Sequence, residues 1–354
     1  MRRINPYPLL VFISSLGLGT ICTLMSTHWI FAWIGLEIST LAIIPLMASS
    51  HHPRATEATF KYFIVQAAGA ATIMLAALIN AQLVTEWQIS STFHPLPATL
   101  AIFALALKLG LAPLHLWLPE VLQGLDLNTG LILSTWQKLA PFALIVQMPC
   151  PHKYILVFIG ALSVLLGGWG GINQTQLRKV LAYSSVAHLG WMLVVSHFAP
   201  NITAFALALY ILINASTFLA FKALNGASIN SLAHSALTIP YLTAAIPWVL
   251  MSLGGIPPLS GFTPKWFIVN ELANNELPIT ALIMVFSTLL SLFFYLRIAR
   301  ALSLIASPNN TLYMGAWQLL KKRFSLIKSQ LIAGAILLLP LTPVIVAIIK
   351  WFLS

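Results

Sequence analysis

Residues 254–261 read Gly-Gly-Ile-Pro-Pro-Leu-Ser-Gly, in the middle of an apolar stretch that extends from about residue 238 to residue 272. A continuous helix is incompatible with this segment, because proline lacks the N–H that a helix needs and clashes with the preceding turn, and glycine weakens helices. About twenty helical residues are enough to cross the roughly 30 Å of hydrocarbon in a bilayer. We therefore predict that this stretch is one membrane crossing made of two half-helices joined by a break.

The composition predicts an all-α integral membrane protein. The chain has 354 residues, of which 59% are hydrophobic and only 7% are charged, whereas a soluble domain has roughly 25% charged residues. Apolar runs of about twenty residues follow one another along the chain, and the short alternating segments of a membrane β-barrel are absent from the sequence. A water-soluble fold is therefore excluded.

Hydropathy and Pro/Gly punctuation predict about eleven transmembrane helices, with the broken stretch counted as one crossing. They are expected at about residues 6–23, 28–48, 60–83, 97–119, 128–147, 153–171, 178–197, 201–222, 238–272, 277–298 and 327–350.

The distribution of basic residues supports this number of crossings. Thirteen of the eighteen lysines and arginines fall on the amino-terminal side of the membrane, and two, Lys153 and Lys350, fall on the opposite side. Counting the broken stretch as two crossings would move the basic loop between Arg297 and Lys328 across the membrane and spoil this asymmetry. The net charge of +11 is therefore explained by topology, and we expect no nucleic-acid partner.

An internal repeat with an offset of 145 residues predicts the domain organisation. Residues 109–120 read Leu-Gly-Leu-Ala-Pro-Leu-His-Leu-Trp-Leu-Pro-Glu and align with residues 254–265. Five spans separate the two segments, so the repeats are expected to have opposite orientations, as in antiporter-like secondary transporters with discontinuous helices. We predict a first five-helix repeat over residues 1–150, a second, inverted five-helix repeat over 151–300, and a basic loop with a C-terminal transmembrane helix over 301–354.

Four charged residues fall inside the predicted spans: Glu37, Lys108, Lys138 and Lys265. Each costs about 2.5 to 3.5 kcal/mol when inserted at the bilayer centre. A Glu–Lys pair that fixes helix register, or a lysine that extends to the interface, is the alternative. That alternative leaves two lysines unexplained. A buried lysine can exchange its proton near neutral pH, and a nearby carboxylate favours its charged form, so we predict a proton relay.

The helix break suggests different surroundings for two of these lysines. Thr263, Pro264 and Lys265 are expected to be the N-cap, N1 and N2 residues of the second half-helix, at the positive end of its dipole. Lys108 precedes the first break, at the negative end of a half-helix dipole.

The repeat is imperfect where the charges lie. At the same offset Glu37 corresponds to Ala182 and Lys138 corresponds to Ile283, so one composite proton route is expected and not two equivalent channels.

Two histidines are further relay candidates. His188 could bridge Lys138 to Lys265 through internal water, and His115 lies in the first break. A structural histidine with satisfied hydrogen bonds is an equally good interpretation of each.

The sequence shows no pattern for a cofactor or metal in this chain. The glycines among residues 167–171 follow no strand and indicate close helix packing, and Cys22 and Cys150 are too few for a cluster or zinc site. The energy for proton movement is therefore expected from other subunits.

Three motifs carry a resemblance to a known family: residues 113–121 (Pro-Leu-His-Leu-Trp-Leu-Pro-Glu-Val), 181–191 (Leu-Ala-Tyr-Ser-Ser-Val-Ala-His-Leu-Gly-Trp) and 254–266. The chain resembles the family of mitochondrial NADH:ubiquinone oxidoreductase chain 2 over its whole length. The resemblance implies a core, antiporter-like subunit of the membrane arm of respiratory complex I, in the mitochondrial inner membrane with the N-terminus in the matrix. It also implies proton translocation coupled to electron transfer from NADH to ubiquinone in other subunits, which use FMN and iron–sulfur clusters.

The family's proton-path residues match Glu37, Lys108, Lys138 and Lys265 of this sequence. The expected roles are that Glu37 tunes Lys108, Lys138 relays laterally and Lys265 gates exit. The expected partners are other membrane-arm subunits, the lipid bilayer, protons and internal water. Two alternatives remain at this point: a free-standing cation/proton antiporter, and a membrane scaffold whose charges only set packing.

Overall fold

The computed structural model describes residues 6–91, 93–149, 151, 153–224, 226–235, 240–305 and 326–353. Cys150 and most of the predicted basic loop, residues 306–325, lie outside the described residues. Two compact units are present, residues 1–163 and residues 164–354.

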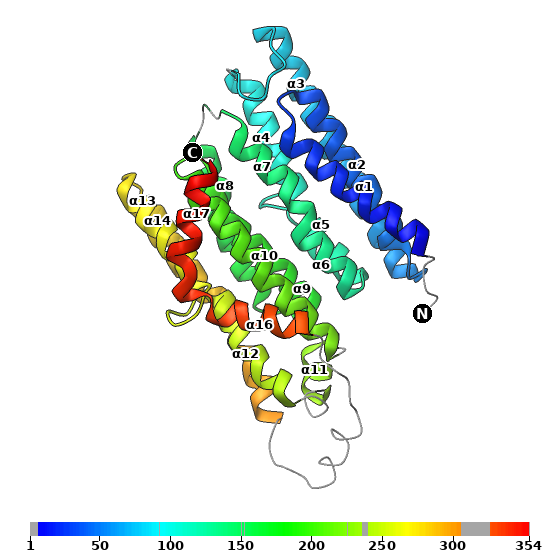
Figure 1. Cartoon of the computed structure of the whole chain (residues 1–354), viewed down its shortest axis with the longest axis vertical. Helices are drawn as coiled ribbons and strands as arrows, with labels where there is room; N and C mark the ends of the chain where they lie inside the picture. Colours follow the sequence, from blue (N-terminus) through cyan, green and yellow to red (C-terminus); the bar gives the residue numbers. More distant parts are fainter. Residues whose placement is uncertain are drawn as a thin grey trace. The chain divides into compact units, whose positions relative to one another are not determined.

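The first unit is helical, with the elements shown in Figure 1. Its elements are α1 (Pro6–Met25), α2 (Trp29–Ala48), α3 (Pro53–Val84), α4 (Pro95–Leu109), α5 (Trp117–Gly124), α6 (Leu127–Thr135), a 3₁₀ turn η1 (Trp136–Lys138) and α7 (Leu139–Gln147). The helix α8 (Lys153–Gly171) begins in this unit and ends in the second.

The second unit is helical as well. Its further elements are α9 (Leu177–Val195), α10 (Pro200–Ala223), α11 (Ile229–Ser235), α12 (Pro240–Gly254), α13 (Phe262–Asn274), α14 (Pro278–Ile305), α16 (Leu326–Leu337), a 3₁₀ turn η3 (Leu339–Leu341) and α17 (Thr342–Leu353). Helices occupy the predicted stretches in both units, and the largest shifts are the earlier start of α3 and the later end of α14.

Small residues allow the first two helices to pack closely. A Cβ atom added to Gly19 of α1 would lie 2.8 Å from the backbone oxygen of Gly35 in α2, and one added to Gly35 would lie 2.6 Å from the Thr23 side chain. Close approach of this kind is the usual basis of helix association in a bilayer, where apolar side chains gain little by leaving lipid.

Seven of the described helices are long and apolar enough to cross a membrane, and a bent pair in residues 328–347 raises this number to eight. The half-helices α4 and α12 have only 15 residues each, because each ends at a break. Large apolar side chains point outward on the spanning helices, among them Phe31 (59% exposed) and Phe60 (70% exposed), as expected of a lipid-facing surface. The prediction of an all-helical multi-pass membrane protein is confirmed.

Both predicted breaks are present, and they match at the offset of the sequence repeat. The helix α4 ends at Leu109 and α12 ends at Gly254, and each is followed by a glycine in the left-handed region, Gly110 with φ of 74° and Gly255 with φ of 81°. Glycine takes this conformation without the steric cost that a Cβ atom imposes. The second half-helices begin at Trp117 and Phe262, again 145 residues apart.

The predicted start of the second half-helix is wrong by about two residues. The helix α13 begins at Phe262 with Gly261 at the N-cap, and Thr263 donates its hydroxyl to the Ser260 carbonyl at 2.9 Å. Lys265 is therefore the fourth residue of this helix and not its second.

A third irregularity lies where the sequence analysis predicts a continuous span. The 3₁₀ turn η1 separates α6 from α7 and ends at Lys138. Its physical cause is Pro141, which has no N–H to offer to the carbonyl of Gln137 four residues earlier.

Candidate functional site

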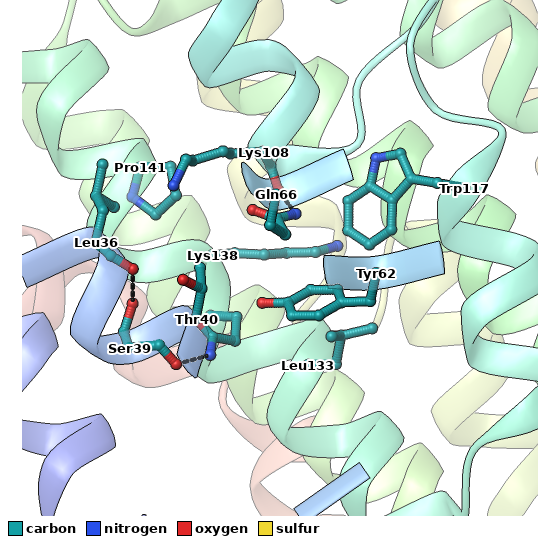
Figure 2. Close-up of a pocket in the computed structure, with 11 residues that line it drawn as sticks. Leu36, Ser39, Thr40, Tyr62, Gln66, Lys108, Trp117, Leu133, Lys138 and Pro141 are labelled. Carbon is teal, nitrogen blue, oxygen red and sulfur yellow. Dashed lines mark hydrogen bonds between the residues drawn. The ribbon is translucent and has the colours of Figure 1, made fainter. Parts of the chain in front are cut away.

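The first unit contains a cavity whose wall includes two of the four predicted relay residues. The space open to the centre of a water molecule is about 10 Å³, which is about the room that one water needs. Polar groups make up much of the wall, and Figure 2 shows the side chains that surround the space. The lining residues are Leu36, Ser39, Thr40, Tyr62, Gln66, Lys108, Trp117, Leu133, Gln137, Lys138 and Pro141.

Lys108 reaches this cavity from the last turn of α4. Its side chain is 5% exposed, and its buried Nζ atom has no hydrogen-bonding partner. The backbone around it is held by neutral donors: Gln66 Nε2 donates to the Lys108 carbonyl at 3.3 Å, and Trp117 Nε1 donates to the Leu107 carbonyl at 3.0 Å. The structure thus fixes the backbone of Lys108 and leaves its ammonium group directed into the cavity.

Glu37 approaches the same site from α2. Its carboxylate Oε2 accepts a hydrogen bond from the Thr40 hydroxyl at 3.1 Å, and it interacts electrostatically with Lys108. Among the described residues, the Lys108 Nζ atom forms no hydrogen bond or ion pair with Glu37. Glu37 is only partly buried within this chain, in contrast to the buried position expected from the sequence.

Lys138 reaches the cavity from η1. It is 2% exposed, and the neighbouring Gln137 donates its Nε2 to the Ser39 carbonyl of α2 at 2.7 Å. Lys108 and Lys138 thus come from separate helical segments and share one cavity, and Thr40 of its wall binds the Glu37 carboxylate.

The second unit has a cavity of its own, around Lys265. The space open to the centre of a water molecule is about 30 Å³ in this cavity. His188 lines this cavity together with Tyr210, and the two rings lie 5.8 Å apart between centroids. The structure therefore brings His188 together with Lys265. His115 lines neither cavity, although it is buried (8% exposed) in the first break.

Lys265 turns back across the second break. Its Nζ donates to the carbonyls of Leu253 at 3.2 Å and Gly254 at 2.8 Å, at the carboxyl end of α12. A Cβ atom on Gly255 would lie 2.8 Å from the Lys265 Cδ atom, so the side chain fills the space beside this glycine. The ammonium group is thus at the negative end of the α12 dipole. The expectation that Lys265 acts from the positive end of its own half-helix is therefore wrong, because the break lets its long side chain reach the other half.

Two amides of the site, Gln66 and Gln137, were not predicted from the sequence. Both hold backbone carbonyls beside the cavity lysines. Their signal was available: a Gln inside an apolar span carries polar groups that need partners in lipid.

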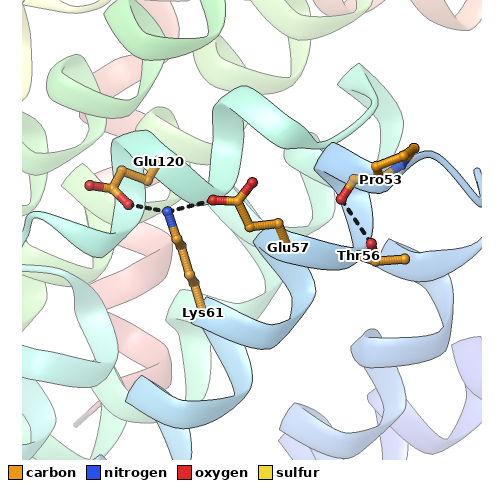
Figure 3. Close-up of polar contacts among 5 residues, drawn as sticks. All are labelled: Pro53, Thr56, Glu57, Lys61 and Glu120. Atoms are coloured by element: carbon orange, nitrogen blue, oxygen red, sulfur yellow. Dashed lines mark hydrogen bonds and ion pairs between the residues drawn. The ribbon is translucent and has the colours of Figure 1, made fainter.

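A second polar cluster lies on the exposed surface of the first unit. Lys61 of α3 pairs with Glu57 at 2.9 Å and with Glu120 of α5 at 2.8 Å (Figure 3). The side chains are between 45% and 64% exposed, so these ion pairs contribute little to stability. They link the half-helix after the first break to α3.

No group of three or more His, Cys, Asp or Glu side chains that could hold a metal ion occurs among the residues that the structure describes.

Comparison with known proteins defines the class. The family model for the transmembrane part of NADH:quinone oxidoreductases and Mrp antiporters matches residues 26–291, and the model for the C-terminus of NADH dehydrogenase subunit 2 matches residues 292–346. The fold is similar to a chain of respiratory complex I from Thermus thermophilus, with a TM-score of 0.83 and 24% identity over 96% of this chain and 81% of that one. It is also similar to a chain of the Mrp complex from Dietzia sp., with a TM-score of 0.73 and 19% identity over 81% of this chain and 59% of that one. The chain has the antiporter-like membrane fold.

Closer relatives identify the family within this class. The NADH-ubiquinone oxidoreductase chain 2 of Oncorhynchus mykiss is 55% identical over 98% of this chain and 99% of the relative, and that of Squalus acanthias is 54% identical over 96% and 98%. The chain belongs to the NADH-ubiquinone oxidoreductase chain 2 family. It is therefore an antiporter-like membrane subunit of respiratory complex I, and the resemblance seen in its motifs is confirmed.

Proposed function

We propose that Glu37, Lys108, Lys138 and Lys265 carry protons through this subunit, driven by electron transfer from NADH to ubiquinone in other subunits of the complex. One observation carries the proposal: Lys108 and Lys138 line a single polar cavity, and the buried Lys108 ammonium group has no hydrogen-bonding partner there. A buried charge of this kind is costly. Proton exchange explains why it is present, because burial adjusts the proton affinity of a group that must gain and lose a proton.

The four residues have different duties in this proposal. Glu37 acts on Lys108 through space, which the electrostatic interaction between them supports. Lys138 receives the proton across the cavity, and Lys265 gates exit in the second unit. His188 shares the cavity of Lys265 and is the better candidate for a further relay group; His115 remains a candidate without such support.

The proposed architecture has eleven crossings, with two inverted five-helix repeats over residues 1–150 and 151–300 and a C-terminal segment over 301–354. The matched half-helices support it, because α4 and α12 have the same length and begin at Pro95 and Pro240, again at the offset of 145 residues. Eight of these crossings are the described spans that qualify by length and apolar composition. The other three are α9 and the two broken pairs, α4 with α5 and α12 with α13.

The proposed setting is the mitochondrial inner membrane, with the N-terminus in the matrix and the other membrane-arm subunits and lipid as partners. The names and organisms of the relatives described above support this setting. In the proposal this chain binds no cofactor, and NADH, FMN, iron–sulfur clusters and ubiquinone belong to the complex as a whole.

Two variants test the relay in assembled complex in membrane vesicles, with proton uptake and NADH oxidation measured together. Lys108→Met and Lys138→Met are expected to assemble and to lower proton uptake, with NADH oxidation either maintained or slowed along with it. Lys153→Met, at the exposed start of α8, is the control and should leave both rates unchanged. Normal proton uptake and NADH oxidation in both cavity variants would contradict the relay and favour a scaffold. Proton exchange by the isolated subunit in vesicles would favour a free-standing antiporter.

A further inference from the structure

Gln137 lies beside Lys138 in the wall of the first cavity, on the 3₁₀ turn η1. Its Nε2 atom donates to the Ser39 carbonyl of α2 at 2.7 Å. This bond joins two elements that are far apart in the sequence, and one of its ends is adjacent to a cavity lysine.

The turn that carries Gln137 needs an external support. Pro141 removes the N–H that the Gln137 carbonyl would otherwise accept, and a 3₁₀ turn has poorer hydrogen-bond geometry than an α-helix. The orientation of Lys138 is therefore not fixed by a continuous helix. A hydrogen bond from the adjacent residue to a neighbouring helix can fix it.

The other end of the bond lies in the part of α2 that belongs to the site. Ser39 is followed by Thr40, which lines the cavity and donates its hydroxyl to the carboxylate of Glu37. The Gln137 amide thus ties the turn of Lys138 to the segment that holds Glu37.

The second unit has no counterpart of the amide, the proline or the lysine of this arrangement. At the offset of 145 residues Gln137 corresponds to Leu282, and Pro141 corresponds to Phe286. The lysine itself corresponds to Ile283, inside the unbroken helix α14. The proline, the amide and the lysine are therefore present together in one repeat and absent together from the other, which links the amide to the lysine and not to helix packing in general.

We infer that Gln137 is a positioning residue for proton transfer: its amide bond to Ser39 holds the broken turn so that Lys138 faces the cavity that it shares with Lys108. The inference rests on the proposed relay. A neutral amide suits this task, because its hydrogen bond does not depend on which neighbouring group carries the proton.

The test compares variants of assembled complex in vesicles, with the rate of proton uptake as the readout, NADH oxidation recorded alongside it, and the loss of uptake in Lys138→Met as the full effect. Gln137→Met keeps the size of the side chain and removes the donor. Its loss of proton uptake should be more than about half of the loss in Lys138→Met, since small displacements strongly slow transfer. Gln137→His places a ring N–H at a similar reach and should restore uptake. The matched control is Gln147→Met, which removes a bond of the same kind from the end of α7 to the Leu24 carbonyl at 3.3 Å, and it should pump normally.

The outcomes separate this inference from the relay. Normal uptake in Gln137→Met with impaired uptake in Lys138→Met overturns the positioning role and leaves the relay standing. Normal uptake in Lys138→Met overturns the relay itself. If Gln137→Met fails to assemble, Gln137→Asn replaces it, because asparagine keeps the donor but is one methylene shorter. Impaired uptake in the assembled Asn variant supports the inference, and normal uptake overturns it.

Discussion

The two helix breaks have the same backbone design and different hydrogen-bond donors. Each follows a 15-residue half-helix and turns at a left-handed glycine, Gly110 in one unit and Gly255 in the other. In both, the last carbonyls of the first half-helix lose the N–H donors that a continuing helix would supply four residues later, and side chains donate to two of them. The difference lies in which side chains supply them.

At the first break the donors are neutral. Gln66 and Trp117 donate to the carbonyls of Lys108 and Leu107, and the lysine ammonium group remains available in the cavity. At the second break the lysine is itself the donor, since Lys265 bonds the carbonyls of Leu253 and Gly254. A proton leaving Lys108 therefore leaves the backbone as it is, whereas a proton leaving Lys265 weakens the cap that stabilises its break. This difference fits a relay role for the first lysine and a gating role for the second.

The largest effect on stability is expected for Lys265→Met. It removes hydrogen bonds from a charged donor, each worth about 1.5–3 kcal/mol, and partial exposure reduces the total to about 2–4 kcal/mol. Hydrogen exchange of the backbone amides of residues 251–257 in the assembled complex should become faster, by the factor that corresponds to this loss of stability. Unchanged exchange in this segment would show that the lysine does not cap α12.

A smaller effect is expected for Gly255→Ala. The added methyl meets both a positive φ and the Lys265 side chain at 2.8 Å, whereas the nearest atom to a methyl on Gly110 lies at 3.3 Å. Gly255→Ala and the control Gly110→Ala each carry a backbone cost of roughly 1 kcal/mol. Only Gly255→Ala also displaces the capping lysine. The thermal midpoint of the complex should fall further for Gly255→Ala, and an equal fall for both glycines would contradict the assigned difference.

Gln66→Leu tests the neutral cap of the first break. The variant leaves the Lys108 carbonyl without its side-chain donor, at a cost of about 1 kcal/mol. Exchange over residues 107–112 should become faster while the second break stays unchanged. The same increase in Gln147→Leu, whose bond is exposed and remote from the break, would mean that the effect is not specific.

The smallest effect on stability is expected for Lys108→Met, although this variant should impair proton uptake. Its Nζ atom makes no hydrogen bond to lose, and removing an unpaired buried charge abolishes its desolvation cost. The thermal midpoint should stay equal or rise slightly. A clear fall would reveal a structural role for this ammonium group and remove the contrast with Lys265.

Much of the fold could be predicted because lipid imposes simple rules. Apolar length predicts the spans, and the two Gly/Pro segments predict the breaks, since helices fail there for local reasons. The turn at Lys138 was missed, because Pro141 alone does not predict it: Pro45 lies inside the continuous helix α2.

The site was predictable only for its charges. Glu37, Lys108, Lys138 and Lys265 stand out because a charge in a span is costly. Gln66 and Gln137 could have been singled out as polar residues inside apolar spans, but their partners are backbone carbonyls of other helices, which no sequence spacing predicts. The position of the Lys265 ammonium group depends on how the chain folds back at the break, and a local assignment of helix ends could not provide it.

The central claim is that the Glu37 carboxylate acts through Lys108 in proton transfer. The most direct test measures the rate of proton uptake by vesicles that contain assembled complex with Glu37→Gln, Lys108→Met or both changes together. Residues that act through one another give non-additive effects in such a cycle. The account predicts that the double variant loses no more proton transfer than Lys108→Met alone, and losses that add in the double variant would contradict it.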